Sequence, residues 1–213
     1  MRTGPSPTMR DPTQVAVLIS GRGSNMRALV ENAGGYSVAL VASNKPLAAG
    51  LAWARERGLA TWAADSKGIG KEEYDRRLST ALEEHGVGTV ALAGFMRILG
   101  AAFLAAYGGR CVNTHPALLP SFPGAHGVRD TLAYGVKVSG LTVHLVDAGV
   151  DTGPIIAQQA VPVLDDDDET SLHERIKVAE RALLVEVIGR MARDGYRVDG
   201  RHVRLGTDKG ATR

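Results

Sequence analysis

The chain has 213 residues, of which 44% are hydrophobic, so it can bury a sizeable core as one large domain or two small ones. Its net charge is only +2 and no basic run stands out, which speaks against nucleic acid as a partner. The single cysteine, Cys111, excludes an intrachain disulfide, and the sequence has no signal peptide and no apolar run of transmembrane length. We therefore predict a cytoplasmic protein without a membrane partner, in which Cys111 is a small buried hydrophobe; a catalytic thiol is the minor alternative.

The chain divides into a short leader and one domain. Residues 1–13 are rich in Pro, Thr and Ser and lack periodicity, which predicts a disordered leader. No repeat, linker or charge block interrupts residues 14–213, so we predict that they form a single domain.

In chain order, apolar runs that predict strands alternate with periodic segments that predict helices. Strands are expected at residues 15–20, 38–43, 59–63, 87–93, 111–114, 138–146 and 155–163, and helices at residues 26–31, 47–57, 71–84, 101–107, 127–134 and 171–193. A hairpin is expected at residues 195–205, where Asp-Gly separates two alternating segments. The repeated βα units predict an α/β fold with a mostly parallel twisted sheet and helices on both faces.

The first strand leads directly into a glycine-rich loop, Gly21-Arg22-Gly23-Ser24-Asn25, and a helix follows. Glycines let backbone N–H groups approach an anion closely, and the N-terminus of a helix attracts negative charge. The loop lacks the third glycine of a dinucleotide fingerprint, and the chain has no Walker motif. A phosphate monoester is therefore the predicted ligand, with a tight turn and ordinary helix capping as the alternative.

A second motif combines an amide, an imidazole and a distant carboxylate. Asn113 and His115 end a predicted strand on the same face, and prolines stiffen the segment that follows. An amide and an imidazolium can stabilise an oxyanion, and a carboxylate such as Asp151 favours the charged imidazole and helps to move protons. The three residues predict direct acyl transfer to an amine. The alternatives are a satisfied core histidine at His115 and a turn held by Asp151.

Three polar or glycine-bearing segments, residues 21–25, 94–99 and 113–116, each follow a predicted strand. Ligands of parallel sheets bind beyond the carboxyl ends of the strands, so we expect these segments to converge at one edge.

The remaining histidines and acidic residues are weaker candidates. His144 lies within a predicted strand and is interpreted as a satisfied core residue, whereas His126 could be either a core or a site residue. The histidines lack compact ligand spacing, so no metal is predicted. The acidic run at residues 165–169 is interpreted as a solvated helix entrance that the helix dipole favours, with a metal site as the alternative.

The motifs occur in an order that resembles a known family. The glycine loop at residues 21–25, Ala-Gly-Phe-Met-Arg-Ile-Leu at residues 93–99, Asn-Thr-His-Pro at residues 113–116 and Gly-Val-Asp-Thr-Gly-Pro at residues 149–154 resemble the phosphoribosylglycinamide formyltransferases, a folate-dependent family of purine synthesis. The resemblance covers about residues 15–193. The glycine loop argues against the methionyl-tRNA formyltransferases, and 13 leader residues cannot supply the regulatory domain usual in formyltetrahydrofolate deformylases.

The resemblance implies a Rossmann-like formyltransferase fold and a specific reaction. The formyl group of 10-formyltetrahydrofolate, a co-substrate, would pass to the amine of N1-(5-phospho-D-ribosyl)glycinamide through a tetrahedral intermediate, in the biosynthesis of IMP. No metal is required, and the family includes homodimers. The implied catalytic residues are Asn113, His115 and Asp151; the implied ribonucleotide-binding residues are Gly21, Arg22, Gly23, Ser24, Asn25, Lys177 and Glu180; the implied folate-binding residues are Met96, Arg97, Ile98, Leu99, Asn113, Val146, Asp147 and Asp151; and His126 has a secondary role.

Overall fold

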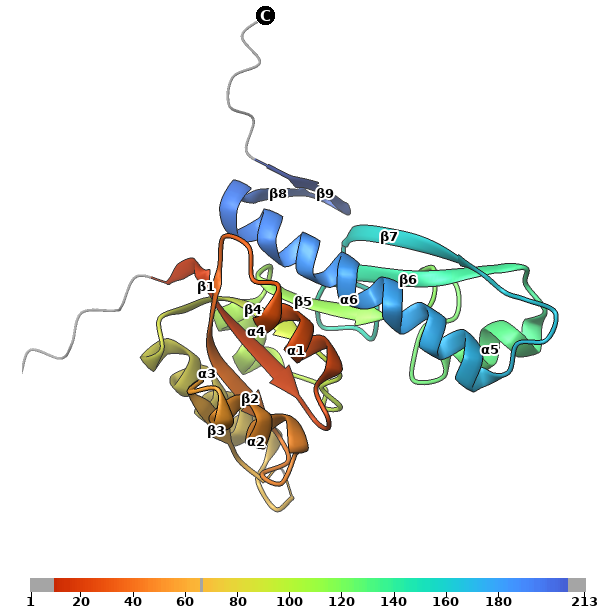
Figure 1. Cartoon of the computed structure of the whole chain (residues 1–213). Coiled ribbons are helices and arrows are strands. Elements are labelled where there is room, and N and C mark those ends of the chain that lie inside the picture. Colours follow the sequence, from red (N-terminus) through yellow and green to blue (C-terminus); the bar gives the residue numbers. More distant parts are fainter. Residues whose placement is uncertain (1–9, 66, 207–213) are drawn as a thin grey trace, which may run out of the picture.

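The computed structural model describes residues 10–65 and 67–206 of the chain. These residues form one nine-stranded sheet with the strand order β3-β2-β1-β4-β5-β6-β7-β9-β8 (Figure 1). The strands are β1 (Asp11–Ile19), β2 (Ser37–Ser43), β3 (Thr61–Ala63), β4 (Val87–Leu92), β5 (Cys111–His115), β6 (Val138–Leu145), β7 (Ile155–Pro162), β8 (Tyr196–Asp199) and β9 (His202–Leu205). The helices are α1 (Ser24–Glu31), α2 (Ala49–Glu56), α3 (Lys71–Glu84), α4 (Ala101–Tyr107), α5 (Gly127–Tyr134) and α6 (Glu169–Asp194).

The sheet is mixed and mostly parallel, which confirms the predicted fold class. Strands β1 to β5 pair in parallel, as expected for consecutive βα units. Strand β6 then runs antiparallel to both β5 and β7, and the β8–β9 hairpin joins the far edge through β9. The sheet order reverses between β1 and β4, which is where a crevice opens in folds of this kind.

Helices cover both faces of the sheet, and β1 shows why. Its side chains alternate, so Val15, Val17 and Ile19 pack with α1, α2 and α6, whereas Ala16 and Leu18 pack with α3 and α4. Figure 1 shows the long helix α6 crossing the sheet beside α1. The core on the α3 and α4 face of the sheet also encloses Cys111. Burial raises the pKa of its thiol, so the prediction of a small buried hydrophobe is confirmed.

The predicted leader is too long at its C-terminal end. Strand β1 begins at Asp11, so the prediction is wrong for residues 11–13; residues 1–9 lie outside the described residues. The reason is tertiary: Asp11 pairs with the start of β4, and the hydroxyl of Thr89 on β4 donates a hydrogen bond to the carbonyl of Pro12 at 2.9 Å. These polar residues carry no apolar periodicity, so only the neighbouring strand reveals that they are ordered.

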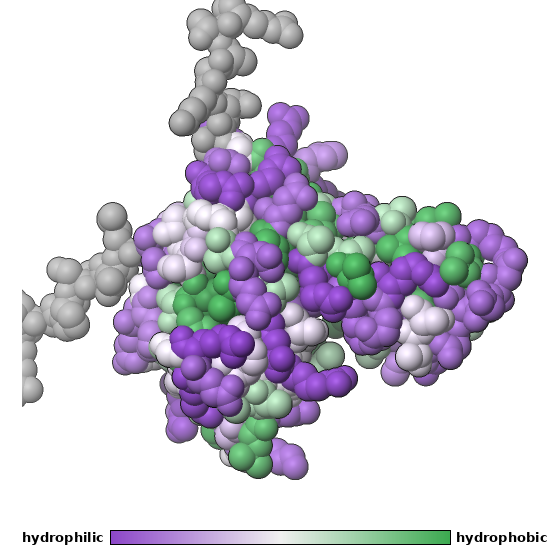
Figure 2. All heavy atoms as spheres, viewed as in Figure 1, coloured by the Kyte–Doolittle hydropathy of each residue, from purple (hydrophilic) through white to green (hydrophobic). Residues whose placement is uncertain are grey.

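The surface in Figure 2 is polar and charged over most of the visible face, and its apolar residues lie in separate patches. Among the residues that the structure describes, no helix is both long and apolar enough to cross a membrane.

Candidate active site

A cleft of about 760 Å³ opens at the carboxyl ends of β1, β4 and β5. Residues 21–25, 94–99 and 113–116 all line it, so their predicted convergence is confirmed. The loop between β6 and β7 and the first half of α6 supply its remaining walls. The cleft therefore combines segments that are far apart in the sequence.

All predicted site residues but one line this cleft. They are Gly21, Arg22, Gly23, Ser24, Asn25, Met96, Arg97, Ile98, Leu99, Asn113, His115, Val146, Asp147, Asp151, Lys177 and Glu180. The exception is His126, which is exposed at the start of α5 and does not line the cleft. The cleft also carries exposed apolar side chains, because Met96, Ile98 and Val150 are 76%, 63% and 55% exposed.

The glycine loop presents the start of α1 to the cleft. Gly23 has a φ of 73°, and a Cβ there would lie 2.8 Å from the side chain of Met26, so the position requires glycine. Gly23 is also the N-cap of α1 and makes no side-chain capping bond, which leaves N–H groups of the first turn for a ligand. Asn25 is 8% exposed, and its Oδ1 has no hydrogen-bond partner among the described residues. This loop suits a phosphate.

His115 ends β5 and contacts two acceptors. Its Nε2 lies 2.7 Å from the carbonyl oxygen of Phe122, and its Nδ1 lies 3.3 Å from Oδ2 of Asp151. Carbonyl and carboxylate oxygens only accept hydrogen bonds, so both contacts are favourable when both ring nitrogens carry a hydrogen. Gly127 permits this packing, because a Cβ there would lie 3.1 Å from Nε2. The ring is thus held by a backbone carbonyl on one side and by Asp151 on the other.

Asp151 faces two histidines. Its Oδ2 accepts a hydrogen bond from the N–H of Gly124 at 2.8 Å, and its Oδ1 lies 3.6 Å from Nε2 of His144. Burial raises the pKa of Asp151, but the contact with His144, the Gly124 N–H and the positive charge of nearby histidines lower it by more. The net pKa lies below the ordinary 3.8, so the carboxylate is ionised at neutral pH.

A different carboxylate holds the turn that carries Asp151. Oδ1 of Asp147 accepts hydrogen bonds from the hydroxyl of Thr152 at 2.6 Å and from the N–H of Gly149 at 3.1 Å. The contacts of Asp151 instead reach other segments, so the alternative in which Asp151 merely holds its own turn is not supported.

His144 is a site residue that the sequence interpretation missed. It is buried, as predicted for a core histidine, yet it lines the cleft and pairs with Asn113 across the β5–β6 ladder. Its Nδ1 lies 2.9 Å from the carbonyl of Leu145, which requires a hydrogen on Nδ1. Its Nε2 lies 3.4 Å from Nδ2 of Asn113 and 3.6 Å from Oδ1 of Asp151, so His144 lies between these two residues in the cleft. The sequence does not reveal this position, because it depends on the antiparallel pairing of β5 with β6.

Helix α6 contributes His173, Lys177 and Glu180, whose spacing places them on one face toward the cleft. Glu180 is buried and accepts a hydrogen bond from the hydroxyl of Thr114. Lys177 is paired with Glu174 at 2.8 Å. Burial, and then the nearby Lys177, lower the pKa of His173. His173 was not predicted, because helical spacing alone does not say which face of α6 meets the cleft. The role of Thr114 was also missed, because it depends on the contact between β5 and Glu180 of α6.

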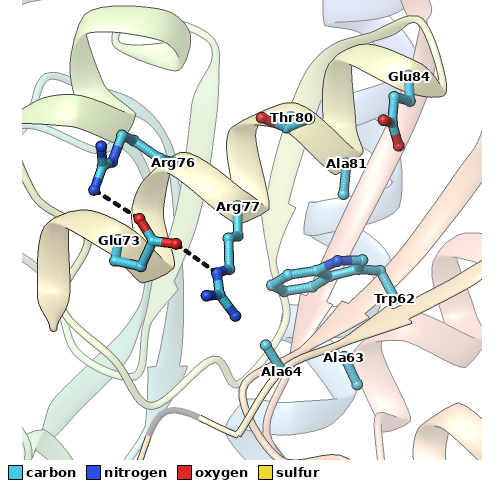
Figure 3. A pocket seen from close by; sticks show the side chains of 9 residues that line it. All are labelled: Trp62, Ala63, Ala64, Glu73, Arg76, Arg77, Thr80, Ala81 and Glu84. Atoms are coloured by element: carbon cyan, nitrogen blue, oxygen red, sulfur yellow. Dashed lines mark hydrogen bonds and ion pairs between the residues drawn. The ribbon is translucent and has the colours of Figure 1, made fainter. Parts of the chain in front are cut away.

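A second hollow of about 550 Å³ lies between β3 and α3. Figure 3 shows that Arg76 and Arg77 both reach Glu73, at 2.6 and 2.7 Å, while Trp62 forms one wall. The charges nearest its centre are thus paired with each other. None of the predicted site residues lines this hollow, so the larger cleft is the candidate active site.

Within the described residues, no group of three or more His, Cys, Asp or Glu side chains is placed to hold a metal ion. The acidic run at residues 165–169 instead begins α6. Asp168 caps the helix by accepting the N–H of Ser171 at 2.8 Å, and Asp167 binds Arg175 through two contacts of 2.6 and 2.8 Å. The interpretation as a helix entrance is confirmed.

Known proteins resemble the chain over most of its length. A family profile described as formyl transferase matches residues 13–188. The phosphoribosylglycinamide formyltransferase of Mycobacterium tuberculosis is 50% identical over 206 residues, covering 92% of this chain and 92% of that protein. The human trifunctional purine biosynthetic protein adenosine-3 is 42% identical over 175 residues, covering 80% of this chain and 17% of that protein. The crystal structure of glycinamide ribonucleotide transformylase 1 from Symbiobacterium toebii has a TM-score of 0.88 at 39% identity, covering 95% of this chain and 96% of that chain.

The profile spans more than half of the chain, so the class of protein is a formyl transferase. Identity and mutual coverage with the mycobacterial protein then place the chain in the phosphoribosylglycinamide formyltransferase family. The resemblance predicted from the motifs is confirmed.

Proposed function

We propose that the chain transfers the formyl group of 10-formyltetrahydrofolate to the amine of N1-(5-phospho-D-ribosyl)glycinamide in purine biosynthesis. The products are the formylated ribonucleotide and tetrahydrofolate. The observation that carries the proposal is the joint placement of Asn113, His115 and Asp151 in one cleft with an anion-binding glycine loop. The names of the relatives point to formyl transfer and to the ribonucleotide, the folate donor comes from the family resemblance, and the cleft has matching chemistry.

The proposed reaction needs no covalent enzyme intermediate. The amine nitrogen of the ribonucleotide attacks the formyl carbon, and the carbonyl oxygen becomes an oxyanion. The amide N–H of Asn113 donates a hydrogen bond to that oxyanion, and His115 stabilises it through its positive charge when it is protonated. Asp151 positions His115 and helps to carry the proton from the attacking amine to N10 of the folate. The bond between the formyl carbon and N10 then breaks, and tetrahydrofolate leaves.

The proposed binding roles divide the cleft between its two ligands. The phosphate lies on residues 21–25, and Lys177 and Glu180 of α6 bind the rest of the ribonucleotide. The folate lies against residues 96–99 and residues 146–151, where the exposed apolar side chains of the cleft are found. His126 keeps only a secondary role in this proposal.

The test is a spectrophotometric assay of tetrahydrofolate formation with both substrates present. We expect turnover that requires the ribonucleotide. If the protein instead releases formate at the same rate without an acceptor, a deformylase activity replaces the proposal. Calorimetric binding of both ligands without any turnover would identify a catalytically idle binding protein on the same scaffold.

The proposal extends to the organisation of the protein. We propose that residues 14–213 form a single formyltransferase domain. One continuous sheet and a profile match over residues 13–188 support this. We propose a cytoplasmic location, because the single cysteine, Cys111, is a free thiol, as is usual in a reducing compartment. A homodimer is included from the family resemblance and is tested by light scattering in solution.

A further inference from the structure

The folate-facing segment at residues 96–99 has an irregular backbone between β4 and α4. Met96 and Ile98 are exposed toward the cleft. Leu99 and the preceding Phe95 are only 6% and 9% exposed and anchor the segment. No ladder or helical bond to its neighbours is expected for such a backbone, so other groups have to fix its shape.

Buried side chains bind both ends of this segment. The N–H of Met96 donates to Oγ of Ser20 at 2.7 Å, and the same hydroxyl donates to Oδ1 of Asn44 at 2.6 Å. At the other end, the N–H of Gly100 donates to Oδ2 of Asp75 at 2.7 Å. Ser20 is 7% exposed and Asp75 is fully buried, so water does not compete for these bonds.

Helix α3 supports the segment at a further point. Tyr74, the residue before Asp75, lies fully buried under Arg97, whose guanidinium carbon is 4.4 Å from the centre of the ring. Helix α3 thus contacts the segment through consecutive residues. The fit is tight, because a Cβ at Gly100 would lie 2.6 Å from Oδ2 of Asp75.

Burying a carboxyl group at the position of Asp75 costs free energy. Burial raises its pKa, although the Gly100 N–H, Arg97 and Lys71 oppose that effect, and its Oδ1 has no partner among the described residues. An apolar side chain would avoid this cost but could not accept the N–H of Gly100. The residue is therefore better explained by what it positions than by its contribution to stability.

We propose that Ser20 and Asp75 are positioning residues that hold residues 96–99 in the conformation that binds folate. The inference rests on the proposed function. Both residues act through the backbone of the segment, and neither needs to touch the substrate. Ser20 has the additional feature that it directly precedes the glycine loop, so it joins the folate side of the cleft to the phosphate side.

The experiment compares Asp75→Ala and Ser20→Ala with wild type, measuring KM for each substrate, kcat, and the calorimetric Kd of tetrahydrofolate. For Asp75→Ala we expect KM for the folate to rise about tenfold or more and KM for the ribonucleotide to stay within about twofold, as fits the loss of one hydrogen bond on the folate side. Ser20→Ala should also raise the folate KM. Asp75→Asn should restore values near wild type, because its amide oxygen can accept the N–H of Gly100.

Thr89→Val is the matched control. It removes another buried side-chain hydrogen bond, from the Thr89 hydroxyl to the carbonyl of Pro12, on the strand that precedes the segment. It should lower thermal stability and leave both KM values unchanged. Equal changes in both KM values for Asp75→Ala, or changes no larger than those of Thr89→Val, would overturn the inference. If Asp75→Ala fails to fold, Ser20→Ala with an unchanged folate KM and Kd overturns it. Wild type without turnover would instead count against the proposed function.

Discussion

At the scale of single residues, the site is held together by Asp151. Its carboxylate faces His115 on one side and His144 on the other, and it reaches across to the N–H of Gly124. Because its pKa is lowered, Asp151 stays ionised at neutral pH. Strand β5, strand β6 and the segment before α5 are thus linked through one side chain.

Asp151→Asn removes the charge and nearly preserves the shape. We expect ligand Kd values within a few-fold of wild type, because the amide oxygen can still accept the N–H of Gly124. Turnover should fall about 10²–10⁴-fold, the usual contribution of a positioned acid–base group. Calorimetry and steady-state kinetics check the two parts. Turnover near that of wild type would remove Asp151 from the mechanism.

Asn113→Ala removes the amide donor opposite His144. Loss of one oxyanion donor costs about 3–4 kcal/mol in the barrier, so kcat should fall by roughly two to three orders of magnitude. The measurement is kcat under saturation with both substrates. Asn113→Asp is the control, because it keeps the size but offers no amide hydrogen, and it should be about as impaired. An active Asp variant would contradict the donor role.

The residues that sequence reasoning found and missed differ in a physical way. Asn113 and His115 share a strand face by simple alternation, so the pattern predicts them. His144 requires the antiparallel register of β6, and His173 requires the orientation of α6. Both depend on packing between elements that are distant in the sequence.

At the scale of elements, the beginnings and ends follow local chemistry. Helices α3, α4 and α5 have the predicted bounds, because glycines lie at or next to their ends. Helix α6 begins at Glu169, two residues earlier than predicted, because Asp168 and Ser171 form a capping box. The antiparallel pairing of β6 with both β5 and β7 is not predictable from the sequence, since apolar alternation is the same in either direction.

Asp168→Ala tests the capping box of α6. Loss of an N-cap carboxylate costs about 1 kcal/mol, which corresponds to a fall in Tm of about 2–4 °C for a domain of this size. Thermal unfolding by circular dichroism measures it. Asp166→Ala, an exposed neighbour in the same acidic run, should leave Tm within about 1 °C of wild type, as surface substitutions usually do. Equal effects of the two variants would mean that net charge matters rather than the cap.

At the scale of the whole molecule, one sheet with two helical layers brings segments from both halves of the chain to one cleft. The βα repeat predicted this layering and the edge at which ligands bind. The length of the leader was misjudged because the pairing of Asp11 with β4 is a long-range contact between polar residues. Local pattern predicts elements well and tertiary pairing less well.

Stability should fall on mild acidification, and His173 is one identifiable cause. Its pKa in the folded chain is lowered from 6.5, so below that value the unfolded chain binds a proton that the native chain resists. The free energy of unfolding then decreases as pH falls, by at most about 1.4 kcal/mol per pH unit for one proton. Asp151 acts in a different range: its lowered pKa contributes stability above about 3.8 that is lost as pH falls through the folded value.

Urea unfolding at pH 7.5 and 5.5 checks this assignment. Between these values (roughly the range in which histidine titrates), His173→Gln should lose less stability than wild type does. The same loss in His173→Gln as in wild type would assign the effect to other groups.

The exposed side chains of Met96, Ile98 and Val150 have a consequence for calorimetry. Burial of apolar surface lowers the heat capacity, so folate binding should have a clearly negative heat-capacity change. The ribonucleotide end of the cleft is polar and its binding should give a much smaller change. Titration at several temperatures measures both, and similar values for the two ligands would contradict the division of the cleft. If the division holds, the enthalpy of folate binding becomes steadily more favourable on warming. The affinity for the ribonucleotide should respond mainly to ionic strength, because its phosphate is charged.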